Sequence, residues 1–108
     1  MNWIQIGRLE DIPRQGSRVI NTASGEIALF RSVDDQVFAL GNRCPHKGGP
    51  LAQGIVHGKR VTCPLHSWVI DLESGSAVAP DVGCARRYEV RVAHDVLFLE
   101  AEAGVCQA

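Results

Sequence analysis

Short apolar runs separated by turn residues are the feature that most constrains how this chain can fold. Gly, Pro, Asn or Asp interrupts the 108 residues about every eight to twelve positions, and several runs between them alternate apolar and polar side chains. Such alternation places one face of a strand in a core, whereas no window keeps the 3.6-residue period of a helix. The sequence therefore predicts an all-β fold, an antiparallel sandwich or small barrel.

Six segments carry the strand pattern most clearly, four before residue 41 and two after residue 86. A turn rich in Asp joins the third and fourth segments as a hairpin, and the last two are expected to close the sheet begun by the first four. Tyr88, Val90 and Val92 share one face of the fifth segment. The predicted strands span residues 3–7, 18–22, 26–31, 36–40, 87–92 and 96–100. The side chains predicted to be buried from the hairpin are Ile27, Leu29, Val37, Phe38 and Leu40.

The middle of the chain has a different amino-acid composition. From residue 41 to about 83 it is rich in Gly, Pro, His and Cys, with brief strand-like pieces at 54–57, 60–63 and 68–72. A chain of 108 residues has room for one hydrophobic core and not for a second domain. The sequence predicts a single domain over residues 1–108 with a loop-rich insertion at about 41–83.

Charge and hydropathy exclude several classes of partner. The formal net charge is -1 and the Arg and Lys residues are scattered, so no basic surface for nucleic acid is expected. No run approaches the roughly 18 apolar residues of a membrane span, and an acid pair stands where a signal peptide needs an apolar core. We therefore expect a cytoplasmic protein that binds neither nucleic acid nor membrane. Because thiols stay reduced in the cytoplasm, its four cysteines point to metal or redox chemistry.

Two loops of the insertion each combine a cysteine with a histidine. One reads Cys-x-His, sixteen residues follow, and the other reads Cys-x-x-His. Two thiolates and two imidazoles can hold one tetrahedral zinc ion or a [2Fe-2S] cluster. Zinc fingers usually take both cysteines from one loop, whereas one of each per loop suits a cluster with both cysteines on one iron and both histidines on the other. The candidate ligands of metal and cofactor are Cys44, His46, Cys63 and His66.

Proline and glycine residues surround these ligands. Pro45 and Pro64 stiffen each loop just past its cysteine, while Gly48 and Gly49 let the backbone approach inorganic sulfide and donate hydrogen bonds to it. This pattern resembles the Rieske iron-sulfur family, whose signature is Cys-x-His and Cys-x-x-His separated by a spacer of this length. The resemblance implies a Rieske-type antiparallel β-sandwich or barrel, a cluster-binding insertion and a role in one-electron transfer.

The resemblance also bears on the reduction potential. Histidine ligation leaves the oxidised cluster neutral and raises the potential to about -150 to +300 mV, against about -400 mV for plant-type ferredoxins. High-potential members of the family join an additional cysteine from each loop in a disulfide, where this chain has Gly49 and Leu65. Their Ser and Tyr hydrogen-bond donors correspond to Trp68 and Ile70 here. We therefore expect a midpoint potential at the low end of the range.

The segment from residue 43 to 92 narrows the resemblance. Its stretches "CPHKGGPL", "GIVHG" and "CPLHSWVIDLESG" are similar to the small subunits of assimilatory NAD(P)H-dependent nitrite reductases. That family implies a large catalytic subunit with FAD, sirohaem and a [4Fe-4S] cluster, which reduces nitrite to ammonium. This chain has no Gly-rich nucleotide turn and no candidate catalytic residue. We expect an electron carrier that has no turnover on its own.

Other interpretations remain open at this point. A free Rieske ferredoxin that donates electrons to an aromatic-ring dioxygenase would have the same ligands, but such ferredoxins usually have Thr in place of Pro45 and Gly in place of Ser67. A zinc-bound interaction module is a third interpretation. Cys84 and Cys106 match neither ligand loop, and we expect them to be spare thiols rather than a disulfide.

Overall fold

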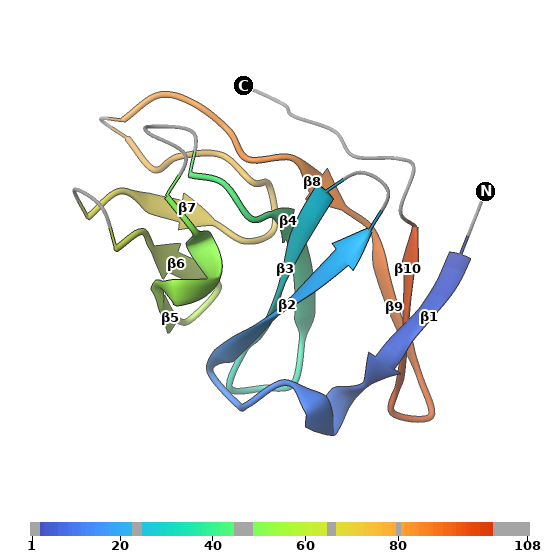
Figure 1. The fold of residues 1–108 in the computed structure, drawn as a ribbon. Coiled ribbons are helices and arrows are strands. Elements are labelled where there is room, and N and C mark those ends of the chain that lie inside the picture. The colour runs from blue at the N-terminus through green and yellow to red at the C-terminus, as the bar shows by residue number, and fades with distance from the viewer. Residues whose placement is uncertain (1–2, 23–24, 45–48, 65–66, 80, 101–108) are drawn as a thin grey trace.

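The structure is a computed structural model, and it describes residues 3–22, 25–44, 49–64, 67–79 and 81–100. Within these ranges the chain forms strands and short 3-10 turns and contains no α-helix (Figure 1). The all-β prediction is confirmed. In the same ranges, no helix is long and apolar enough to cross a membrane.

Ten strands and two 3-10 turns follow one another through the described ranges. The first part of the chain forms β1 (Trp3–Arg8), η1 (Leu9–Asp11), β2 (Gly16–Thr22), β3 (Gly25–Arg31) and β4 (Val37–Gly41). The middle forms η2 (Leu51–Gln53), β5 (Ile55–His57), β6 (Arg60–Thr62) and β7 (Val69–Asp71). The last part forms β8 (Arg87–Tyr88), β9 (Val90–Ala93) and β10 (Val96–Glu100).

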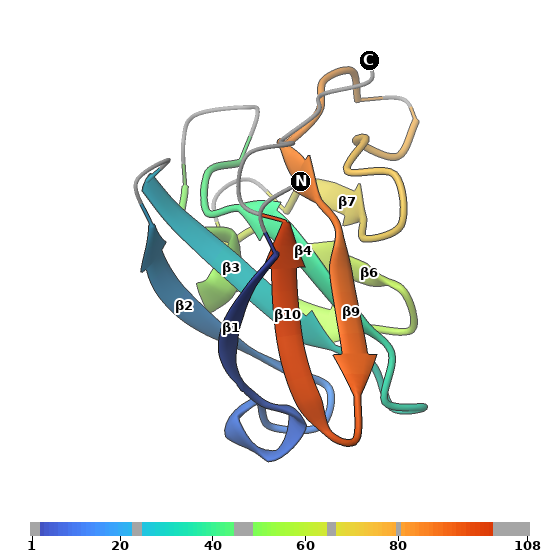
Figure 2. The same cartoon turned by 90° about the vertical axis from the view of Figure 1, so that its right-hand side faces the viewer.

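These strands form three antiparallel sheets. Their orders are β1-β10-β9, β2-β3-β4-β8 and β5-β6-β7. Figure 1 shows the sheet of β2, β3, β4 and β8 in the middle of the molecule, with β1, β9 and β10 on one side and the small sheet of β5, β6 and β7 on the other. Figure 2 shows β1, β10 and β9 as a layer in front of this central sheet.

The prediction that the last two strands close the sheet of the first four is confirmed in part, because β8 pairs with β4 and β10 pairs with β1, but these pairs belong to two sheets. The segment predicted as one strand at 87–92 is divided between two sheets. Its first part, β8, pairs with β4 through Ala39 opposite Tyr88, and its second part, β9, pairs with β10. The change of sheet occurs at Glu89, whose carbonyl accepts a hydrogen bond from the Glu100 amide at 3.0 Å. β1 joins β10 rather than β2.

Strand β3 is buried on both faces. Ile27 and Leu29 pack into a core shared with β9 and β10, whereas Ala28 and Phe30 pack into a second core beneath the small sheet. All four side chains are fully buried. Full burial of a side chain such as that of Phe30 contributes roughly 1.5–3 kcal/mol to the free energy of unfolding. Because the side chains of β3 enter both cores, this one strand stabilises both halves of the molecule.

The predicted hairpin residues are buried to different degrees. Leu40 is fully buried in the core beneath the small sheet, and Phe38 packs against that core while staying partly exposed. Val37 is also partly exposed and packs against the other core. The hairpin turn is formed as predicted, because the Asp35 amide donates to the Ser32 carbonyl. The side chain of Asp35 accepts a hydrogen bond from Arg31, which lowers the pKa of the Asp35 carboxyl.

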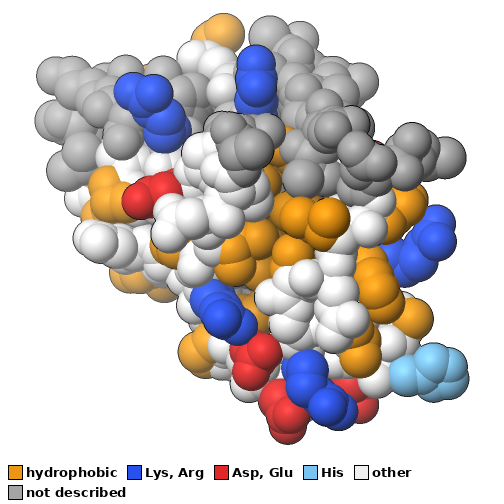
Figure 3. Space-filling view, turned by 45° about the vertical axis from the view of Figure 1, so that its right-hand side comes forward, with side chains coloured by type: hydrophobic (Ala, Val, Ile, Leu, Met, Phe, Trp, Pro, Cys, Tyr) orange, Lys and Arg blue, Asp and Glu red, His pale blue; other side chains and the backbone are white. Residues whose placement is uncertain are grey.

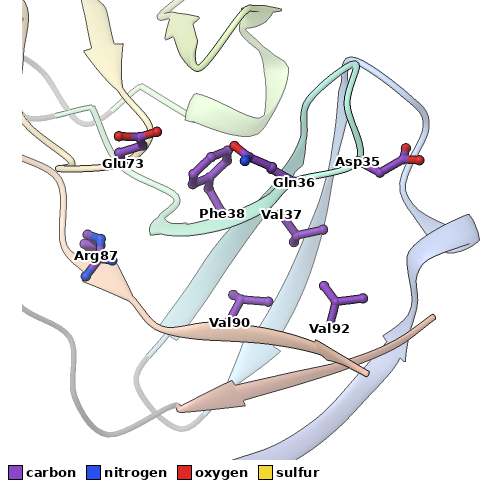
Figure 4. A pocket seen from close by; sticks show the side chains of 8 residues that line it. All are labelled: Asp35, Gln36, Val37, Phe38, Glu73, Arg87, Val90 and Val92. Carbon is purple, nitrogen blue, oxygen red and sulfur yellow. The ribbon is translucent and has the colours of Figure 1, made fainter. Parts of the chain in front are cut away.

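A shallow groove opens where the two larger sheets separate beyond Glu89. Its volume is about 530 Å³, and Figure 4 shows Val37 and Phe38 on β4 and Val90 and Val92 on β9 along its walls. Val92 is 40% exposed there, so the third member of the predicted apolar face does not enter the core. The separation of β4 from β9 is a direct result of the change of sheet.

The surface carries mixed charge on the face that Figure 3 shows. Basic and acidic side chains are interspersed on this face, with apolar side chains between them, and they do not gather into one basic patch. Six ion pairs among the described residues join exposed or partly exposed groups, including Lys59 with Glu73 and Arg87 with Glu89. Such exposed pairs contribute little stability each.

The two-residue turn between β9 and β10 gives a prediction about stability. His94 and Asp95 both have positive φ, +50° and +62°, in a turn type that favours glycine at its second position. We expect Asp95→Gly to raise the free energy of unfolding by roughly 0.5–1 kcal/mol, because the strain of a left-handed residue is removed. Chemical denaturation of the two proteins measures this difference. Asp81→Gly is the control, since φ of Asp81 is not positive, and a gain of the same size there would contradict the explanation.

Candidate metal centre

Cys44 and Cys63 are the two predicted ligands that the structure describes. Cys44 lies three residues after the end of β4, and Cys63 directly follows β6. Cys44 is 3% exposed and Cys63 is 1% exposed, and neither takes part in a disulfide. Both thiols are therefore reduced and shielded from water, which is the state that a buried metal ligand requires.

The two ligand loops are closed by the same type of hydrogen bond. The Cys44 amide donates to the Gly49 carbonyl at 2.7 Å, and the Cys63 amide donates to the Trp68 carbonyl at 2.6 Å. In each case the acceptor stands five residues after the cysteine, so each bond encloses four residues, one of which is a predicted histidine ligand. The repeated Cys-Pro and His residues of the sequence thus accompany a repeated closing hydrogen bond.

The two cysteines belong to one buried apolar cluster. This cluster lies between the central sheet and the small sheet, and η2 covers part of it. Its other fully buried members include Ala28, Phe30, Leu40, Leu51, Val61, Ile70 and Leu72. Two thiolates in such surroundings are costly unless positive charge compensates them.

A [2Fe-2S] cluster with two thiolate and two neutral imidazole ligands meets this condition. The charges of two ferric ions, two sulfides and two thiolates cancel, so the oxidised centre is neutral. A lone zinc ion with the same ligands would also be neutral, so charge alone does not separate the two metals. The thiol donors and their apolar surroundings fit the iron-sulfur cluster, and the order of the ligands in the sequence favours it over zinc.

The small sheet supports the second loop directly. Strand β6 pairs with β5 on one side and β7 on the other, so Cys63 continues a strand that is held at both edges. The Leu72 amide donates to the Lys59 carbonyl at 2.9 Å, and the Lys59 ammonium lies 2.9 Å from the Glu73 carboxylate. That hydrogen bond with Glu73 raises the pKa of Lys59. The turns at one end of the sheet are thus tied to each other.

Ser67 has an unusual backbone conformation within the second loop. Its φ is +57°, in the left-handed region that favours glycine. The corresponding position of the first loop, one residue before the accepting carbonyl, is occupied by Gly48 in the sequence. Trp68 follows, and its side chain packs against the buried cluster. The second loop therefore accepts local strain where the first has a glycine.

The predicted histidine ligands lie outside the described residues. This applies to His46 and His66, and also to Pro45, Gly48 and Leu65 of the sequence argument. Among the described residues alone, no group of three or more His, Cys, Asp or Glu is placed to hold a metal ion. Ligation by His46 and His66 therefore stays a prediction.

Other sequence predictions can be compared with the structure. Asp71 forms a turn, because its carboxylate accepts the Glu73 amide at 2.8 Å. Ile70, at the position of a hydroxyl donor in high-potential Rieske proteins, is fully buried and apolar. The expectation of a spare thiol at Cys84 is wrong, since Cys84 is part of a disulfide. Cys106 lies outside the described residues.

Sequence reasoning missed Asn42. This side chain is 7% exposed and hydrogen-bonded on both sides, two residues before Cys44. A polar residue at the edge of a Gly-rich loop reads as an exposed turn former, so the sequence pattern alone contains no signal of its burial. The one available hint was its position between a predicted strand and a predicted ligand.

Buried reduced thiols at the start of two loops of an antiparallel β fold are the arrangement expected of a small iron-sulfur domain. The family model of the Rieske [2Fe-2S] domain matches residues 2–89, which is most of the chain. This chain belongs to the Rieske [2Fe-2S] domain family, and a domain of this family carries a [2Fe-2S] cluster and transfers electrons. The resemblance inferred from the ligand motif is confirmed at the level of the family.

The curated relatives belong to several oxidoreductase systems. The ferredoxin component of naphthalene 1,2-dioxygenase/salicylate 5-hydroxylase systems of Ralstonia sp is 29% identical, over 94% of this chain and 97% of that protein. The 4beta-methylsterol monooxygenase of Methylococcus capsulatus is 38% identical over 78% of this chain. The cholesterol 7-desaturase of Hemicentrotus pulcherrimus is 32% identical over 70% of it. The matched part is only 19% and 16% of the length of these two enzymes.

Solved structures with the same fold include chains from dioxygenase systems and nitrite reductase small subunits. A chain in the complex of reduced oxygenase and oxidised ferredoxin of carbazole 1,9a-dioxygenase superposes with a TM-score of 0.83 at 22% identity, covering 95% of this chain and 96% of that one. A protein assigned as the NADH-dependent nitrite reductase small subunit of Mycobacterium tuberculosis has a TM-score of 0.81 at 24% identity, covering 91% and 93%. These likenesses establish the fold, and the Rieske-type β architecture is confirmed.

Ser67 gives a prediction about the second ligand loop. We expect Ser67→Gly to raise the midpoint of thermal unfolding, because glycine adopts a φ of +57° without strain. Ser67→Val should lower it and should speed the loss of visible cluster absorption, since a β-branched side chain is disfavoured in the left-handed region. Thermal unfolding followed by circular dichroism and by visible absorption measures both effects. Equal stability of the two variants would contradict this interpretation.

Proposed function

We propose that this chain is a one-electron carrier that holds its [2Fe-2S] cluster through Cys44, His46, Cys63 and His66. The observation that carries the proposal is the equivalent closure of two loops that begin at buried, reduced cysteines. Each loop contributes one sulfur and one imidazole, with both cysteines on one iron and both histidines on the other. The ligands lie within the insertion at about 41–83 of a single domain spanning residues 1–108.

The specific role that we propose is the small subunit of an NAD(P)H-dependent nitrite reductase. The similarity of the stretches at residues 44–51, 54–58 and 63–75 to that family supports this role. Structures assigned as such small subunits share the fold, one of them over 92% of this chain with a TM-score of 0.80. The proposed partner is a large catalytic subunit with FAD, sirohaem and a [4Fe-4S] cluster, in the cytoplasm. This chain would pass single electrons in the reduction of nitrite to ammonium.

A second candidate is a free ferredoxin that serves an aromatic-ring dioxygenase. The full-length match to the ferredoxin component from Ralstonia sp favours it, because this chain and that protein cover nearly all of each other. The carbazole 1,9a-dioxygenase complex gives an example of the same fold beside an oxygenase. Ser67 and Pro45 argue for the nitrite reductase role, since dioxygenase ferredoxins usually have Gly and Thr there.

The midpoint potential tests the proposed cluster environment. We expect a midpoint below about -50 mV, toward the low end of the range for the Rieske class. The physical reason is that Trp68 and Ile70 offer no hydroxyl to stabilise the added electron, and Gly49 replaces a disulfide cysteine. Redox titration followed by EPR gives the value. A midpoint above about +100 mV would contradict the expectation.

Electron transfer to defined partners separates the two candidate roles. The chain is reduced anaerobically and mixed either with the sirohaem subunit or with a ring-hydroxylating oxygenase encoded in the same genome. We expect the reduced chain to be reoxidised quickly by the sirohaem subunit and to form a stable complex with it, and to do neither with the oxygenase. The variant Cys63→Ser is the control for cluster-dependent transfer, because loss of a thiolate ligand removes the cluster. Reoxidation by the oxygenase alone would establish the ferredoxin role instead.

A further inference from the structure

Asn42 connects the two sides of the first ligand loop. Its backbone amide donates to the Glu26 carbonyl at 3.0 Å, and its side-chain Nδ2 donates to Glu26 Oε1 at 3.1 Å. Its Oδ1 accepts the backbone amide of Ala52 at 2.9 Å. Glu26 lies on β3, and Ala52 lies in η2, directly beyond the loop that begins at Cys44. The residue before the loop is therefore bonded both to the central sheet and to the segment after the loop.

Ala52 is held from its other side as well. The Ser17 hydroxyl of β2 donates to the Ala52 carbonyl in a short hydrogen bond. The amide and carbonyl of one peptide segment are thus bound by Asn42 and by Ser17. A continuous chain of hydrogen bonds runs from β2 through η2 and Asn42 to β3.

The chemistry of these bonds requires asparagine. A backbone amide only donates and an ionised carboxylate only accepts, so the side chain between Ala52 and Glu26 must accept on one branch and donate on the other. Asparagine supplies both at the length of this gap. Aspartate would place a second carboxylate 3.1 Å from Glu26 Oε1, and alanine would leave the Ala52 amide without its acceptor.

The two ligand loops need this bridge to different degrees. Cys63 directly follows β6, which is paired on both edges, so its position is set by a sheet. Cys44 stands three residues beyond β4, and the regular pairing of β4 ends at Gly41. The bridge at Asn42 supplies the support that the first loop does not receive from a sheet.

We propose that Asn42 is a positioning residue for the cluster, fixing the base of the first ligand loop and through it the orientation of Cys44. The proposal rests on the ligation of the cluster by Cys44 and is independent of which partner receives the electron. Outer groups that hold a metal ligand in place commonly change the retention of the metal about 10–100-fold when they are removed. Asn42 would act in this way through the backbone, without touching the cluster.

The test uses the full chain purified anaerobically with its cluster. We expect Asn42→Ala to speed the loss of the cluster to an iron chelator by at least about tenfold and to broaden the EPR signal of the reduced protein. Loss of visible absorption gives the rate. The matched control is Asn21→Ala, because Asn21 is exposed on β2 directly opposite Glu26 in the strand register. The control should leave both the rate and the EPR signal unchanged.

A reciprocal exchange provides the second arm. Asn42→Asp alone should speed cluster loss, because two carboxylates then face each other. Adding Glu26→Gln should restore a slow rate, since the glutamine amide can donate to the new carboxylate while the Ala52 amide keeps its acceptor. This arm also serves if Asn42→Ala does not fold. Rescue by the double variant would show that the polarity of the bridge matters, and the rate of cluster loss compared with the thermal midpoint separates positioning of the cluster from overall stability.

Each outcome has a defined meaning. If the unaltered chain contains no iron and no acid-labile sulfide, the proposed ligation itself fails. If the unaltered chain holds its cluster and Asn42→Ala loses it no faster, the positioning role is overturned while the cluster assignment stands. A lower thermal midpoint without a change in cluster loss or EPR signal would overturn it equally. If Glu26→Gln does not rescue Asn42→Asp, the proposed donor and acceptor roles of the Asn42 side chain are contradicted.

Discussion

The structure depends on holding two reduced thiols, the proposed sulfur ligands, inside an apolar core although they come from separate loops. An unbalanced thiolate is poorly tolerated there, so the arrangement makes physical sense when a cationic centre cancels the charge. The backbone contributes the geometry: the amides of Cys44 and Cys63 each close a loop onto a carbonyl five residues on. The central sheet below and the small sheet above then exclude water from both sulfurs.

The two loops share the type of hydrogen bond that closes them and differ in what supports them. The loop at Cys63 extends a strand that is paired along both edges, and it carries its strain at Ser67. The loop at Cys44 lacks such a strand and is bounded by Asn42, which is bonded to β3 and η2. The same closing hydrogen bond is thus supported in two different ways.

Most strand positions and the Rieske family could be predicted from the sequence, because alternation, turn residues and motif spacing are local patterns. Which strands pair with each other could not be predicted. At Glu89 the chain passes from one sheet to another without interrupting its alternation, so the pattern gave no sign of the change. The burial of Asn42 depends on its hydrogen bonds to β3 and η2, and no local pattern indicated the disulfide at Cys84. Phe30 faces a second core that a one-sided strand pattern does not anticipate.

Because β3 is buried on both faces, the insertion that carries the proposed ligands cannot simply be moved into another protein without it. Ala28 and Phe30 belong to the same buried cluster as Cys44 and Cys63, although they precede Cys44 by more than a dozen positions. A peptide cut to the insertion alone would carry the proposed ligands without these two residues and would expose its apolar underside to solvent. A miniature electron carrier derived from this chain would have to bring the central hairpin with it, or replace it with an equally flat apolar surface.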